Sequence, residues 1–98
     1  MTFQIKVLYP EGISAIQDSE LKPTLEDLQR IVGGYLEPIS VLNEDTPRRL
    51  YRTMLVDEDG RQKQRPLNAE ATRLYRAAWG STPAIVGTAV LLMNFKLD

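Results

Sequence analysis

Arginine is the side chain of this sequence best suited to ligand chemistry, and most of it falls in one stretch. Residues 48–76 carry eight basic side chains, seven of them arginine, against four acidic ones, whereas residues 1–47 carry three basic and eight acidic side chains. A guanidinium group holds phosphate or carboxylate through two parallel hydrogen bonds. The stretch therefore indicates an anion-binding face, although a solvated surface of ion pairs would have the same composition.

One place in this stretch combines an arginine with the start of a helix. In the segment RPLNAEAT, Asn68 is an expected N-cap, so the first backbone N–H groups of the helix face the loop that contains Arg65. Thr72 lies one turn further along the same helix. A phosphate or carboxylate group is expected to dock there, and the alternative is a helix cap with no further role.

The tetrapeptide RLYR occurs twice, at residues 49–52 and 73–76, and is too short to be a repeat. A tyrosine ring beside an arginine can stack on a nucleotide base, but most such tyrosines are half-buried core residues. Arg49 and Arg52 of the first copy join the predicted anion site.

The absence of histidine and cysteine excludes several chemistries. A Ser-His-Asp triad, a cysteine nucleophile, a disulfide framework and a thiolate zinc site cannot be built from this chain. The segment DEDG is not a calcium loop, because the twelfth residue from Asp57 is Asn68 rather than Glu. We therefore expect a protein that is not an enzyme and uses no cofactor and no metal.

The glycine pair in RIVGGYLEP closes a helix, whereas phosphate-binding glycine loops open one. Gly33 is expected to be the left-handed cap of that helix, and Gly34 allows the chain to reverse. Tyr35 and Glu37 would then lie on one side of the following strand and meet the turn at residues 65–68. The complete predicted ligand-binding set is Tyr35, Glu37, Arg49, Arg52, Arg65, Asn68 and Thr72.

Hydrophobic periodicity predicts the elements that position these residues. Helices are expected over residues 24–33 and 69–79. Extended segments are expected at residues 3–10, 13–21 (a short strand or a loop), 35–42, 48–57 and 84–95. Pro38 indicates that its strand lies at a sheet edge or starts irregularly, and the last strand, apolar on both faces, is expected in the middle of the sheet. Asp59-Gly60 predicts a hairpin, with residues 61–67 as its return arm.

This order predicts one small α+β domain of 98 residues. Its two helices are expected on one face of a mostly antiparallel or mixed sheet of four to five strands. No signal peptide and no membrane-spanning stretch is present in the sequence, so a cytoplasmic protein is expected. A net charge of −1 argues against nucleic-acid binding. A domain this small can gain stability from self-association, so a homo-oligomer is a further expectation.

Three segments together resemble a family of small proteins of unknown function encoded by phages and plasmids. They are TLEDLQRIVGGYLE (residues 24–37), LVDEDGRQKQRPLNAEATRLY (residues 55–75) and AIVGTAVLL (residues 84–92). The matching positions are Gly33, Gly34, Tyr35, Glu37, Asp59, Gly60, Pro66, Asn68, Ala71, Thr72, Val86 and Gly87. The chain departs from the family pattern in its basic RQKQR and in the longer RAAWGSTP.

The resemblance implies a non-catalytic protein that acts on host machinery. One hypothesis is an anti-defence protein that sequesters a phosphate-bearing nucleotide signal. The alternative is a protein–protein inhibitor of a host defence or regulatory enzyme. The partners expected at this point are therefore an anionic small molecule or a host protein.

Overall fold

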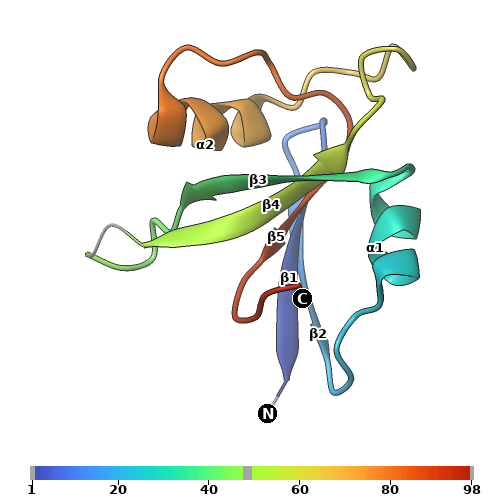
Figure 1. Cartoon of the computed structure of the whole chain (residues 1–98), viewed down its shortest axis with the longest axis vertical. Helices are drawn as coiled ribbons and strands as arrows, with labels where there is room; N and C mark the ends of the chain where they lie inside the picture. Colours follow the sequence, from blue (N-terminus) through green and yellow to red (C-terminus); the bar gives the residue numbers. More distant parts are fainter. Residues whose placement is uncertain (1, 48–49, 98) are drawn as a thin grey trace.

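The structure is a computed structural model that describes residues 2–47 and 50–97, and it contains a five-stranded sheet and two helices (Figure 1). The strands are β1 (Phe3–Leu8), β2 (Ser14–Ser19), β3 (Leu36–Leu42), β4 (Tyr51–Asp57) and β5 (Ala89–Leu92). The helices are α1 (Leu25–Val32) and α2 (Ala69–Trp79). The sheet order is β2-β1-β5-β4-β3, and every neighbouring pair is antiparallel. The predicted α+β class and element order are confirmed.

Strand β5 lies at the centre of the sheet, as its apolar sequence predicts. All four of its residues are buried, and its neighbours are β1 and β4, with Ile5 opposite Leu92 and Met54 opposite Leu91. The predicted strand at residues 84–95 was too long, because the segment before β5 leaves the sheet. Gly87 has a φ of +80°, and its N–H donates to the carbonyl of Pro66 instead of to a strand.

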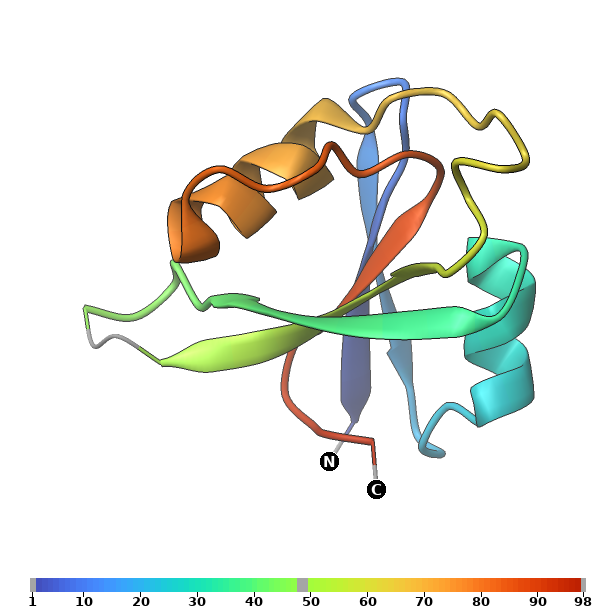
Figure 2. The same ribbon diagram turned by 45° about the horizontal axis from the view of Figure 1, so that its top comes forward.

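The two helices cover opposite faces of the sheet, so the predicted placement on one face was wrong (Figures 1 and 2). Helix α1 packs on the face that carries Ile5, Val7, Leu55, Val90 and Leu92. Helix α2 packs on the face that carries Leu8, Ile39, Val41, Met54, Val56, Ala89 and Leu91. The central strands are apolar on both sides, and each of their faces needs a cover. Over the described residues, neither helix has the length and apolar content needed to cross a bilayer.

Helix α1 begins and ends where its sequence predicts. The Thr24 hydroxyl accepts from the Asp27 N–H, and the Asp27 carboxylate accepts from the Thr24 N–H, which is a capping box. Gly33 ends the helix with a φ of +89°, in the left-handed region that favours glycine. The chain therefore turns sharply at Gly33 and Gly34 into β3.

The segment after β4 is not a hairpin, and its predicted return arm does not pair with β4. Residues 58–64 form consecutive turns. In these turns the Lys63 N–H donates to the Asp59 backbone carbonyl, and the Arg65 N–H donates to the Gly60 carbonyl. Beyond them, Leu67 makes an isolated bridge to Val86. The side chains of Lys63 and Arg65 turn back to Asp57 at the end of β4, and these contacts replace strand pairing.

Strand β3 lies at an edge of the sheet, as Pro38 predicts. The Glu58 N–H donates to the Tyr35 carbonyl, and the Asn43 N–H donates to the Leu50 carbonyl. The odd-numbered residues of β3 therefore direct their backbone N–H and C=O groups toward β4. The even-numbered ones therefore face outward, and Pro38 has no outward donor. The indole of Trp79 donates to the outward carbonyl of Ser40 at 2.6 Å. This edge is thus partly closed.

Candidate functional site

A buried carboxylate, Asp57, ends β4 and gathers the basic residues of the following turns. Its side chain has no exposed area, and its Oδ2 lies 2.8 Å from Lys63 Nζ and 3.0 Å from Arg65 Nε. Its Oδ1 accepts from the Asp59 N–H at 2.9 Å. Three donors therefore hold this carboxylate, which compensates for its removal from water.

The pKa of Asp57 lies below its usual value of 3.8. Burial raises this pKa, but the hydrogen bonds from Lys63 and the Asp59 N–H, together with the charges of Lys63 and Arg65, outweigh burial. A carboxyl group with a lowered pKa stabilises the fold above its unfolded pKa, and this contribution is lost as the pH falls through the folded pKa.

We expect the free energy of unfolding to fall as the pH drops below 3.8, in step with protonation of Asp57. The measurement is urea unfolding across this range, together with the NMR titration of the Asp57 carboxyl carbon. A titration midpoint at or above 3.8 would contradict the ion-pair geometry.

The glycine pair after α1 forms the other wall of this cluster. Arg65 Nη2 donates to the Gly33 carbonyl at 2.8 Å, and Lys63 Nζ does so at 3.2 Å. A Cβ on Gly34 would lie 2.5 Å from Lys63 Nζ and 2.6 Å from Asp57 Oδ1. The second glycine is therefore explained by the close approach of the Asp57–Lys63 ion pair to the backbone.

Asn68 caps α2 and also ties together three parts of the chain. It is fully buried, and its Oδ1 accepts from the Ala71 N–H at 3.1 Å. Its Nδ2 donates to the carbonyls of Leu8 at 3.0 Å and Gly87 at 2.8 Å. The hydroxyl of Thr72, also buried, donates to the Asn68 carbonyl and accepts from the Ile85 N–H. Both polar side chains are thus occupied within the fold.

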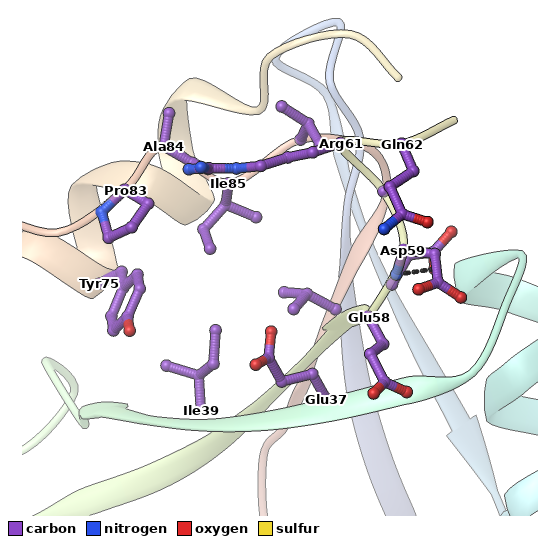
Figure 3. A pocket seen from close by; sticks show the side chains of 14 residues that line it. Glu37, Ile39, Glu58, Asp59, Arg61, Gln62, Tyr75, Pro83, Ala84 and Ile85 are labelled. Atoms are coloured by element: carbon purple, nitrogen blue, oxygen red, sulfur yellow. Dashed lines mark hydrogen bonds between the residues drawn. The ribbon is translucent and has the colours of Figure 1, made fainter. Parts of the chain in front are cut away.

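Next to this cluster lies the groove, an open hollow of about 450 Å³ between β3, the end of β4, α2 and residues 83–86 (Figure 3). Its floor is apolar and consists of the buried side chains of Ile39, Val56 and Ile85. The half-buried ring of Tyr75 forms one wall. A volume of this size and an apolar floor are typical of ligand pockets.

The rim of the groove is mainly acidic. Glu37, Glu58 and Asp59 line it, and Figure 3 shows the Glu37 side chain directed into the hollow. Among the described residues, none of these three carboxylates has a basic partner within ion-pair distance. Arg61 spans the opposite side and donates to the Ala84 carbonyl at 2.9 Å. The groove therefore presents an apolar floor beneath a surplus of negative charge.

The predicted site residues do not converge on one hollow. Glu37 lines the groove, whereas Tyr35, which is 69% exposed, borders a shallow surface beside α1. The turn at Arg65 does meet the segment that precedes β3, but through the Gly33 carbonyl rather than through Tyr35 or Glu37. Arg52 lies elsewhere, 2.9 Å from Asp45. Arg49 lies outside the described residues.

One further basic group of the arginine-rich stretch, Arg73, also has acidic partners. Arg73 contacts Glu44 at 2.8 Å and Glu70 at 2.7 Å. The hydrogen bonds to Glu70 and Glu44 raise the pKa of Arg73 above the ordinary arginine value. Arg61 and Arg76 differ, since they donate to the carbonyls of Ala84 and Thr82 and have no carboxylate partner in the described part of the chain. Within residues 2–47 and 50–97, no group of three or more acidic side chains is placed to hold a metal ion.

Sequence reasoning missed two residues that define this region, Asp57 and Tyr75. A signal for Asp57 was present, because this acid directly follows the apolar run of Met54–Val56, and an acid that is buried with such a strand needs a basic partner. An apolar stripe on the predicted helix at residues 69–79 can include Tyr75, but the stripe alone does not show that its ring borders a hollow.

Comparison with known proteins gives a family but no activity. The model of a family described as a domain of unknown function, DUF3846, matches residues 5–95, which is most of the chain. No curated protein and no solved structure matches the chain significantly.

Proposed function

The chain belongs to the DUF3846 family, and this membership assigns no activity. From the groove, we propose that the chain is a non-catalytic protein that binds another protein. The observation that carries the proposal is the combination of an apolar floor with unpaired carboxylates on the rim. An arginine or lysine side chain of a partner fits this combination, because its alkyl stem covers apolar surface while its charged end meets the rim.

This proposal favours the inhibitor hypothesis over nucleotide sequestration. Glu37, Glu58 and Asp59 would repel a phosphate at the groove. Four of the basic side chains that suggested an anion site, Arg52, Lys63, Arg65 and Arg73, have carboxylate partners of their own. In the phage- or plasmid-encoded setting that the sequence motifs suggest, the partner would be a host defence or regulatory protein.

A phosphate-bearing nucleotide is the second candidate, and one observation favours it. The guanidinium groups of Arg61 and Arg76 donate to carbonyls of the same segment, residues 82–84, and no carboxylate neutralises them among the residues described. A phosphate that bound there would exchange these carbonyl contacts for charged ones.

We expect the amphipathic cation acetyl-Leu-Arg-amide to shift the backbone NMR signals of Ile39, Val56, Tyr75 and Ile85. Replacing both Glu37 and Glu58 with Gln should weaken this binding about three- to tenfold, since an exposed charge pair contributes up to roughly 1 kcal/mol. The matched control is Glu20→Gln, which removes an exposed carboxylate outside the groove and should leave the affinity unchanged.

The same titration with ADP-ribose distinguishes the two candidates. Shifts confined to Arg61, Arg76 and residues 82–84, with none from the dipeptide, would reject the protein-binding proposal in favour of the nucleotide. Loss of dipeptide binding in the Glu20→Gln control would show that the effect does not arise in the groove.

A further inference from the structure

The two edges of the sheet differ in how they are protected. At the β3 edge, Pro38 removes one outward donor and Trp79 occupies the outward carbonyl of Ser40. At the other edge, β2 runs for six residues with neither proline nor lysine, which are common protective residues on edge strands. Ile16, in the middle of β2, is 57% exposed.

The hydrogen-bond pattern shows which backbone groups of β2 are free. Tyr9 N–H donates to the Ile13 carbonyl at 2.9 Å, so the odd-numbered residues of β2 direct their backbone groups toward β1. Successive residues of a strand direct their backbone groups to opposite sides. The N–H and C=O groups of Ser14, Ile16 and Asp18 therefore point away from the sheet. In the part of the chain that the structure describes, none of these outward groups has a hydrogen-bond partner.

We propose that β2 pairs with β2 of a second copy of this chain, antiparallel and with Ile16 opposite Ile16. In this register, Ser14 of each copy lies opposite Asp18 of the other. All the outward backbone groups of the strand then find partners, and the two sheets become one continuous sheet. A shift of the register by one or more residues leaves some of these groups without a partner in the opposite strand.

The side chains of β2 suit this pairing. The two Ile16 side chains meet at the centre, and each Ser14 hydroxyl can donate to the opposite Asp18 carboxylate. The two Asp18 carboxylates are separated by four residues along the strand, or about 13 Å. Salt screens most of their repulsion at that distance. On the other face, Ala15 lies opposite Gln17, and no like charges oppose each other anywhere along the strand.

The first test is the oligomeric state of the full chain by light scattering and sedimentation. The wild type should be a dimer at about 100 μM. Ile16→Lys should raise the dissociation constant at least about tenfold, because two like charges would lie directly opposite each other. Leu21→Lys, at a position 83% exposed beyond the end of β2, is the matched control and should remain a dimer.

The second test measures the register and does not depend on a disruptive change. The chain has no cysteine, so introduced thiols are its only ones. Residues 15 and 17 form a non-hydrogen-bonded pair across the proposed interface, with Cα atoms about 4.5 Å apart, within the range of a disulfide. A mixture of the Ala15→Cys and Gln17→Cys proteins should therefore form a mixed disulfide dimer under mild oxidation, whereas either protein alone should remain uncrosslinked.

Three results would overturn the proposal. They are a wild type that stays monomeric up to about 1 mM, an Ile16→Lys variant that folds and dimerises like the wild type, or a mixture of the two cysteine proteins that gives no mixed disulfide. If Ile16→Lys fails to fold, which its circular dichroism would show, the cysteine pair still decides the outcome.

Discussion

Replacing Asn68 with Ala should lower the free energy of unfolding by about 3–7 kcal/mol. Loss of the helix cap accounts for about 1 kcal/mol. The remainder comes from the carbonyls of Leu8 and Gly87, which lose a buried donor at about 1–3 kcal/mol each. The loss is a large part of the total stability of about 5–15 kcal/mol that a domain has. Urea unfolding followed by circular dichroism measures it.

Thr24→Ala is the control that separates capping from the internal hydrogen bonds. Thr24 caps α1 through its hydroxyl on the protein surface and orphans no buried carbonyl, so its loss should cost about 1 kcal/mol. Asn68→Asp keeps the cap acceptor but removes both amide donors, and it should destabilise at least as much as Asn68→Ala. Equal costs for Thr24→Ala and Asn68→Ala would show that Asn68 is only a cap.

Replacing Asp57 with Asn should cost about 2–3 kcal/mol at pH 7. Breaking a buried ion pair costs about 3–5 kcal/mol, and the cost here is smaller because Lys63 and Arg65 are 39% and 33% exposed and can turn toward water. For a domain of this size, the melting temperature should fall by roughly 10–20 °C. Residues 58–66 should also become more sensitive to proteolysis, because their anchor to the end of β4 is weakened.

Glu58→Gln is the matched control for Asp57→Asn. It neutralises the next carboxylate along the chain, which is exposed and has no ion pair among the described residues. Its cost should stay within about 0.5 kcal/mol. If the two variants were equally stable, the ion pairs of Asp57 would contribute nothing measurable to the fold.

Local signals in the sequence were sufficient for most of the elements. The capping box at Thr24 and Asp27, the cap at Asn68 and the edge position of Pro38 each depend on a few neighbouring residues, and the structure confirms all three. Periodicity also placed β5 at the centre of the sheet. Periodicity did not assign the helices to faces of the sheet. An apolar stripe shows that a helix packs against other residues, but it does not show which face of the sheet the helix packs on.

The errors concern long-range interactions. Asp59-Gly60 is a good hairpin signal locally, but Lys63 and Arg65 return to Asp57, and no local pattern shows this ion pair. Arg65 contacts this carboxylate of its own chain, and its role in binding a ligand anion stays a prediction. The groove could not be predicted, since its lining comes from β3, β4, α2 and residues 83–86.

The position of β5 between β1 and β4 has a consequence for the order of folding. The pairs β1–β2 and β3–β4 join neighbours in the sequence and can form early as separate ribbons. Nothing joins the two ribbons into one sheet until residues 89–92 insert between them. Closing the loop from β1 to β5 costs chain entropy before the contacts are gained, which makes folding slow for a domain of this length. During synthesis, the sheet can therefore be completed only after β5 has left the ribosome.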